Sequence, residues 1–192
     1  PETVEIATSI TRPNGEYGCT GKTRLLRPES KIRFAVEQIA PGSYDNEVRE
    51  HRGLSLGQNA SRTSVFTGGP WGQLGVFLDL VGDDNLLFRD PAYARSQGLD
   101  NVILPGGLLG GMISDLMGTE LPGRGTNWLK QRYDFVKPAH PNTTITANVE
   151  IVRLRPEKDL VNLRTTCVDQ TGGLVLEGEA LVWVSDLELR RQ

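Results

Sequence analysis

The sequence predicts an α+β fold in which one buried helix is followed by an antiparallel meander, a sheet whose consecutive strands pair. Two observations carry this prediction. A wide apolar stripe at helical spacing runs through residues 108–117, and four long alternating runs follow it. Proline, glycine, asparagine and aspartate cluster between these runs and mark turns. A sheet that wraps one helix accounts for this order of patterns.

The chain divides into two parts by the strength of its patterns. Residues 1–50 have only patchy alternation and predict an N-terminal extension of short strands and turns. The clearest strand pattern within this extension covers residues 31–39. Stronger patterns begin near residue 52, so we expect one domain over residues 51–192.

A strand and two helices are expected in the first part of this domain. Residues 61–67 predict the strand, and apolar residues at helical spacing predict a helix over residues 71–81 after a Gly-Gly-Pro turn. A short helix is expected over residues 90–95, because Asp90 is a good N-cap and proline suits the first helical position.

The central helix is expected to begin at the Pro-Gly-Gly sequence of residues 105–107. Gly110 and Gly111 each weaken a helix by about 1 kcal/mol relative to alanine. Such a helix is stable only when it is buried and the glycines permit close backbone contact. Its apolar stripe comprises Leu108, Leu109, Met112, Ile113, Leu116 and Met117. The strands expected after it cover residues 128–136, 143–154, 160–168 and 174–184.

Composition excludes several classes of protein. The 192 residues carry a net charge of -3, and no basic face alternates with aromatic residues, which argues against nucleic-acid binding. No apolar stretch reaches the roughly 20 residues that a bilayer requires, and we expect neither a membrane span nor a signal peptide. Cys19 and Cys167 need no disulfide, and no metal site is expected. These features predict a cytoplasmic protein.

Residues 82–94, GDDNLLFRDPAYA, directly follow an apolar segment. They resemble the hydratase signature of the MaoC-like family, the (R)-specific enoyl-CoA hydratases and dehydratases. Further matches follow in order at residues 105–107, 118–126 and 135–138, and the resemblance covers residues 52–185. It implies a hot-dog fold, in which a curved antiparallel sheet wraps a long central helix. Such proteins are usually dimeric, with acyl-thioester sites near the subunit interface.

The resemblance also implies a chemistry for the signature, which in the family reads roughly G-D-x-N-P-x-H. Its Asp and His activate one water, which is added to or removed from a 2-enoyl thioester. Positioned proton transfer of this kind contributes about 10²–10⁴-fold to a rate. Asp83 and Asn85 match the Asp and Asn of the family, whereas Phe88 stands at the His position. Phe88 carries no proton, so the standard pair is absent.

A second departure from the family lies at the start of the central helix. Pro105 stands where the family has the His of a His-Gly pair. The backbone N–H of Gly106, with Gly107 beside it, can still hold the thioester carbonyl, because the positive end of a helix favours the developing enolate. The residues expected to line the substrate are therefore Phe88, Pro105, Gly106 and Gly107.

Other groups are considered for the missing proton carrier. Asp84 is adjacent to Asp83, and paired acids can separate their pKa values so that one donates a proton, although a solvated loop carboxylate also explains Asp84. His51 lies in a charged run, and His140 lies in a proline-flanked turn where solvent exposure is expected. Asp83 itself suits either catalysis or the capping of a turn. Asp83, Asp84 and Asn85 are the candidate catalytic residues.

These observations predict a hydro-lyase of the hydratase or dehydratase type. Its substrate would be a thioester of CoA or acyl-carrier protein, and it would use no cofactor. We expect a homodimer, or a heterodimer with a homologue. Two alternatives stay open. The site could be repurposed for thioester hydrolysis, decarboxylation or cyclisation, or the chain could be a non-catalytic subunit that pairs with a catalytic homologue.

Overall fold

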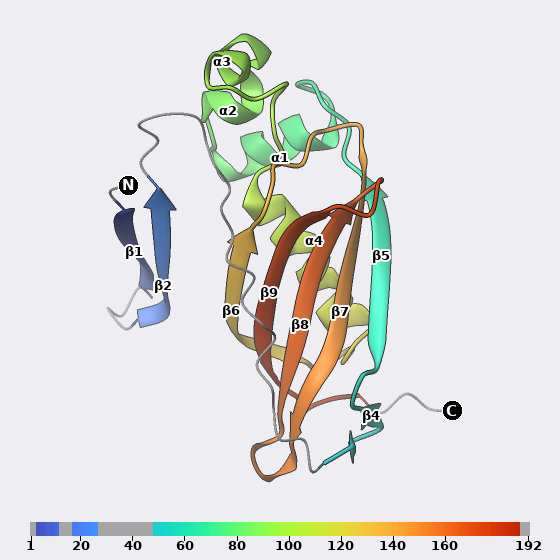
Figure 1. The fold of residues 1–192 in the computed structure, drawn as a ribbon. Coiled ribbons are helices and arrows are strands. Elements are labelled where there is room, and N and C mark those ends of the chain that lie inside the picture. Colours follow the sequence, from blue (N-terminus) through green and yellow to red (C-terminus); the bar gives the residue numbers. More distant parts are fainter. Residues whose placement is uncertain (1–2, 12–16, 27–47, 189–192) are drawn as a thin grey trace. The chain divides into compact units, whose positions relative to one another are not determined.

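The computed structural model describes residues 3–11, 17–26 and 48–188, with side chains described from residue 48 onward (Figure 1). The chain divides into two compact units, Pro1–Arg33 and Phe34–Gln192. The first unit contains an antiparallel hairpin of β1 (Thr3–Thr11) and β2 (Tyr17–Leu26). The strand expected over residues 31–39 lies outside the described residues.

A five-stranded antiparallel sheet forms the framework of the second unit. Side chains along β7 and β8 alternate mostly between buried and half-buried positions, as expected for strands with one face against a core. In order across the sheet, the strands are β5 (Asn59–Val65), β7 (Thr144–Arg155), β8 (Leu160–Asp169), β9 (Leu174–Trp183) and β6 (Asn127–Phe135).

β6 lies at one edge of this sheet, beside β9. The sequence pattern predicted a meander of all four C-terminal strands, which is wrong for β6, since only β7, β8 and β9 pair consecutively. Most side chains of β6 are exposed, with none in the buried class. A strand that buries so little needs a neighbour on one side only, and it therefore fits an edge.

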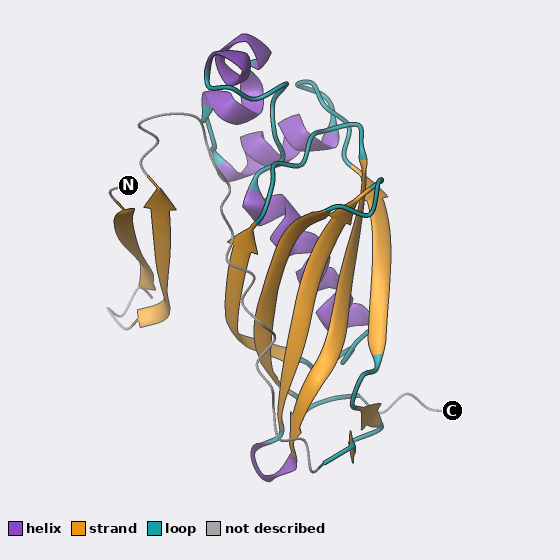
Figure 2. Ribbon diagram, viewed as in Figure 1, coloured by secondary structure: helices purple, strands orange, loops and turns teal. Residues whose placement is uncertain are grey.

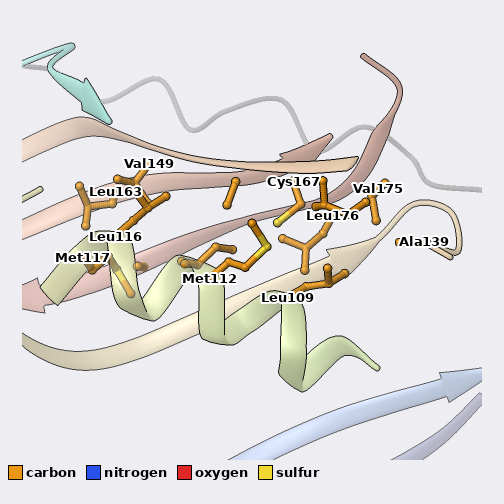
Figure 3. Close-up of a cluster of buried hydrophobic side chains, with 14 of the residues drawn as sticks. Leu109, Met112, Leu116, Met117, Ala139, Val149, Leu163, Cys167, Val175 and Leu176 are labelled. Carbon is orange, nitrogen blue, oxygen red and sulfur yellow. The ribbon is translucent and has the colours of Figure 1, made fainter. Parts of the chain in front are cut away.

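The helix α4 (Gly106–Thr119) packs against one face of the sheet (Figure 2). Of the six apolar residues in the predicted stripe, all except the partly buried Leu108 are buried. Each buried side chain of this size contributes about 1.5–3 kcal/mol. Figure 3 shows the two layers facing each other, with Leu109, Met112, Leu116 and Met117 on α4, and Val149, Leu163, Cys167 and Leu176 on the strands.

Three short helices gather at the end of the sheet where α4 begins (Figure 1). They are α1 (Gln73–Val81), α2 (Leu86–Arg89) and α3 (Pro91–Ser96). The predicted cap of α3 is confirmed, because the Asp90 carboxylate accepts hydrogen bonds from the N–H groups of Ala92 (2.7 Å) and Tyr93 (3.1 Å). The sequence did not predict α2, which is only four residues long.

The small hairpin of β3 (Glu50–His51) and β4 (Leu54–Ser55) lies at the opposite end of the sheet (Figure 1). The short 3₁₀ helix η1 (Pro156–Lys158) connects β7 to β8. Within the part of the chain that the structure describes, no helix has both the length and the apolar character needed to cross a membrane.

Candidate functional site

The first turn of α4 presents backbone N–H groups without a side-chain cap. Pro105 is the N-cap residue and provides no side-chain hydrogen bond, and Gly106 and Gly107 are the first two helical residues. The N–H of Leu108 turns back to the Pro105 carbonyl at 3.0 Å. Helix N-termini leave such donors unpaired and carry a partial positive charge. The arrangement can therefore accept a carbonyl oxygen that gains negative charge during a reaction.

Two backbone hydrogen bonds hold the segment that leads into this turn. The N–H of Leu104 donates to the Ala139 carbonyl at 2.8 Å, and the N–H of Ile103 donates to the Leu87 carbonyl of α2 at 3.2 Å. The segment is thus tied to the connection after β6 on one side and to α2 on the other. These contacts hold the backbone from which α4 begins.

Aromatic rings close around the glycines of the first turn. A Cβ added at Gly106 would overlap the ring of Phe135 from β6. A Cβ at Gly107 would lie 3.5 Å from Cζ of Phe77 on α1. An alanine at position 106 would have to displace this ring. The expected close contacts concerned Gly110 and Gly111, and that expectation is wrong for Gly111, where an added Cβ meets nothing within 4 Å. Phe135 is 45% exposed, so its ring lies at the surface of this region.

Tyr133 lies two residues before Phe135 on β6 and faces the next turn of α4. Its hydroxyl would lie 3.2 Å from a Cβ at Gly110, and its ring centroid is 6.1 Å from that of Phe135. The hydroxyl is buried and has no hydrogen-bond partner among the described residues. Burial raises the pKa of this phenol far above its usual value.

Asp83 directly follows the left-handed C-cap of α1 at Gly82. Its N–H donates to the Leu78 carbonyl at 2.8 Å, and its Oδ1 accepts a hydrogen bond from the N–H of Asn85 at 2.9 Å. The Oδ1 of Asn85 in turn accepts from the N–H of Leu87 at 3.0 Å and caps α2. Both side chains therefore hold the backbone between α1 and α2, and Asp83 is partly buried.

Asp84 points away from this turn. Its side chain is 96% exposed, and its carboxylate lies 3.7 Å from Nε of Arg89. The same guanidinium donates to the Asp83 carbonyl and to the Asp79 carboxylate, each at 2.8 Å. Asp84 thus belongs to a surface cluster around Arg89.

Phe88 lies on α2, where it is partly buried and packs against the hydrophobic core. Two features link the Asp83–Phe88 segment to the α4 start. A Cβ added at Gly107 would lie 3.5 Å from Phe77 of α1, and the Leu87 carbonyl of α2 accepts a hydrogen bond from the N–H of Ile103.

The two histidines lie in different environments. His140 is partly buried instead of solvent-exposed, and its Nδ1 lies 2.8 Å from the Val102 carbonyl oxygen, which adds a third tie to the segment before α4. His51 pairs with Asp159 at 2.9 Å in the β3–β4 hairpin, at the opposite end of the sheet (Figure 1). Within one protomer, His51 is therefore not brought to the start of α4.

Sequence reasoning missed Phe77, Tyr133 and Phe135 as residues of this site. The available signal was the spacing of Gly106 and Gly110, which share one face of α4 and leave room for rings. Which strand supplies the rings cannot be inferred from that spacing. Over residues 48–188, no group of three or more His, Cys, Asp or Glu side chains is arranged to hold a metal ion.

The chain is similar in sequence and fold to hydratases. It is 35% identical over 129 residues to the (R)-specific enoyl-CoA hydratase of Aeromonas caviae, covering 67% of this chain and 94% of the relative. It is 33% identical over 141 residues to the enzyme of that name from Rhodospirillum rubrum, covering 73% and 91%. The solved (R)-hydratase of Aeromonas caviae superposes with a TM-score of 0.65 at 34% identity, covering 69% of this chain and 98% of that structure. The chain matches no family model.

These likenesses define a hydratase of the hot-dog class. The chain belongs to the MaoC-like family of (R)-specific enoyl-CoA hydratases and dehydratases. The predicted hot-dog fold, with an antiparallel sheet against one long helix, is confirmed.

Proposed function

We propose that this protein is a hydro-lyase that adds water to, or removes it from, the acyl group of a CoA or acyl-carrier-protein thioester. The observation that carries the proposal is the uncapped glycine start of α4, in a chain 35% identical to an (R)-specific enoyl-CoA hydratase. Another relative, 32% identical over 112 residues, is a 3-hydroxybutyryl-CoA dehydratase from Methylorubrum extorquens. A hydratase adds water to an enoyl thioester and a dehydratase removes it from a 3-hydroxyacyl thioester, so the two names describe opposite directions of one reaction.

In this proposal the N–H groups of Gly106 and Gly107 hold the thioester oxygen. Charge that moves onto this oxygen as an enolate forms is stabilised by the positive end of α4. Asp83 takes a proton from water while the water oxygen bonds to the third acyl carbon, and Asp83 then delivers this proton to the second carbon, which restores its carboxylate. Since Asn85 donates to Oδ1 of Asp83, the other carboxylate oxygen is assigned to the water.

Hydration of crotonyl-CoA tests this assignment through the loss of enoyl absorbance. We expect Asp83→Asn to lower the rate by about 10²–10⁴-fold, the usual contribution of a positioned proton-transfer group. An asparagine keeps the oxygen that accepts from Asn85, so the turn is retained. Asp84→Asn is the matched control, since Asp84 is exposed beside it. Equal rates in the two variants would contradict the role of Asp83.

A non-catalytic subunit is the second candidate function. Two observations favour it: Asp83 and Asn85 both bond local backbone, and Phe88 places a ring where the resemblance puts the family His. Under this alternative, purified protein is inactive with every enoyl thioester and co-purifies with a homologue that carries the histidine. Turnover by the protein alone excludes it.

We also propose that two copies associate through the edge strand β6. Trp128, Leu129 and Phe135 of β6 are all large apolar residues that are at least 40% exposed. The other edge, β5, carries one such residue, Val65. An unpaired edge with exposed apolar side chains is a template for pairing with another chain. A homologue in place of the second copy gives a heterodimer through the same edge.

The assignment of domains and location follows from the same features. We propose that residues 51–192 form the hydratase domain and residues 1–50 an extension of it, since the residues of the candidate site all lie after residue 51. A cytoplasmic location fits Cys167, which is a free and buried thiol. Fractionation of the producing cells tests the location.

A further inference from the structure

The hydroxyl of Tyr133 is a buried polar group without a partner among the described side chains. Tyrosine hydroxyls usually find a hydrogen-bond partner when they are buried. A buried donor left unpaired costs about 1–3 kcal/mol. A phenylalanine would fill the same space without this cost, so the hydroxyl calls for a partner other than the described residues, such as a bound ligand.

The position of Tyr133 relates this hydroxyl to the α4 start. Gly110, which the hydroxyl faces, comes four residues after Gly106, about 6 Å further along the helix axis. An acyl chain whose carbonyl is held at the first turn reaches the level of Gly110 within its first few carbons. Tyr133 is only partly buried, and the exposed Phe135, two residues further on, is the last residue of the strand.

A second unpaired polar atom lies on the same face of β6. Gln131 is two residues before Tyr133, so the two side chains project from the same side of the strand. Its Nε2 donates to the Thr165 hydroxyl at 3.0 Å, whereas its buried Oε1 has no partner among residues 48–188. The face of β6 turned towards α4 is therefore more polar than a channel for a plain hydrocarbon chain requires.

The chemistry of the hydroxyl restricts its role. Burial keeps the Tyr133 phenol in its neutral form because the charged form is disfavoured there. A neutral phenol that keeps its proton donates a hydrogen bond and does not serve as a base. The group that fits it is an oxygen atom of the ligand.

We propose that the Tyr133 hydroxyl donates a hydrogen bond to an oxygen on the third carbon of the bound acyl chain, so that the site prefers 3-oxygenated acyl thioesters to saturated ones. The inference rests on the proposed function and specifies its substrate class. Tyr133 is then a specificity-determining residue, and it leaves the proton transfer to Asp83. A site built to bond a ligand oxygen discriminates against an analogue that lacks it, because its own polar group is then left unpaired.

Binding of two inert ligands tests the inference without any turnover. Acetoacetyl-CoA carries a 3-oxo group, butyryl-CoA is its saturated counterpart, and neither can be hydrated or dehydrated. We expect the wild-type protein to bind acetoacetyl-CoA about tenfold more tightly, as one hydrogen bond of about 1.4 kcal/mol gives. Tyr133→Phe should bring the ratio of the two dissociation constants to about one. Tyr93→Phe, at a tyrosine that is 39% exposed, is the matched control and should keep the wild-type ratio.

Thermal unfolding separates this role from a structural one. If the hydroxyl has no partner in the free protein, Tyr133→Phe keeps or raises the melting temperature while the ligand preference disappears. A preference that persists in Tyr133→Phe, or its absence from the wild-type protein, overturns the inference. If Tyr133→Phe has a lower melting temperature and an unchanged ligand preference, the hydroxyl bonds a buried water instead of the ligand, and the inference is also overturned. Failure to hydrate crotonyl-CoA contradicts the proposed function alone, since the binding ratio needs no reaction.

Discussion

At the scale of single residues, the segment from Asp83 to Phe88 contains two side chains that cap the local backbone and one aromatic side chain, Phe88, that takes no part in the capping. Asp83 and Asn85 each accept a hydrogen bond from an N–H group two residues further along, as short polar side chains do in turns. Phe88 contributes packing, and its ring offers no proton. The resemblance to the family implies a histidine at this position and another at Pro105.

Restoring both groups tests whether only the proton carriers differ from the family. We expect Phe88→His with Pro105→His to raise the rate of crotonyl-CoA hydration by at least tenfold, because positioned acid–base catalysis contributes about 10²–10⁴-fold. The rate is measured against the unaltered protein, and Asp83→Asn in the doubly substituted background serves as the control. If the double variant gains nothing, the pocket itself has changed shape.

At the scale of elements, the start of α4 depends on the contact between Gly106 and Phe135. We expect Gly106→Ala to destabilise the protein by about 1 kcal/mol or more, because the new methyl group must displace the ring. Gly111→Ala is the matched control on the same helix, where an added Cβ meets nothing within 4 Å. That change should stabilise the protein by up to about 1 kcal/mol through helix propensity.

Urea unfolding of the two variants measures this difference. We expect Gly106→Ala to lower the free energy of unfolding and Gly111→Ala to raise it. If both variants are less stable than the wild-type protein, the difference between a closely packed glycine and an open one does not explain their stabilities.

The turn between β8 and β9 is joined to the end of β6 by a charged contact. The Lys137 ammonium bonds the Asp169 carboxylate, which also accepts from Thr171 and the N–H of Gly173. The lysine, followed by the Thr171 hydroxyl, holds the pKa of Asp169 well below its ordinary value of 3.8. The ionised form is therefore favoured in the folded state.

This contact predicts a pH dependence of stability. A carboxylate with a depressed pKa stabilises the fold fully above its unfolded pKa, and this contribution is lost as the pH falls through the lower folded pKa. We expect Asp169→Asn to lower the melting temperature at pH 7 and the difference from the wild-type protein to shrink below about pH 4. Asp100→Asn, at an exposed aspartate, is the control. A difference that grows in acid would contradict the assignment.

At the scale of the whole molecule, the proposed dimer depends on the β6 edge. We expect Leu129→Glu to shift the protein from dimer towards monomer, because it places a charge in the centre of the apolar edge. Sedimentation velocity measures the two species. Leu80→Glu, on the 82% exposed Leu80 of α1, is the matched control and should leave the dimer intact. Dimers that persist in Leu129→Glu would place the interface elsewhere.

The predicted and observed secondary structure agree closely where the prediction rests on local sequence patterns. The last four strands begin and end within one residue of their predicted bounds, and the Asp90 cap was found in advance. The helix α2 was missed, because four residues are too few for periodicity to be detected. The position of β6 was also missed, since strand order depends on contacts between segments far apart in the chain.

The sequence by itself determined the buried helix, its glycine start and the strands around it, because apolar spacing, caps and turn residues act over a few neighbouring positions. Only the tertiary structure decided which rings meet those glycines. Phe135 reaches Gly106 and Tyr133 reaches Gly110 through the register of β6 against α4. That register is set by packing across the whole sheet, and no local pattern specifies it.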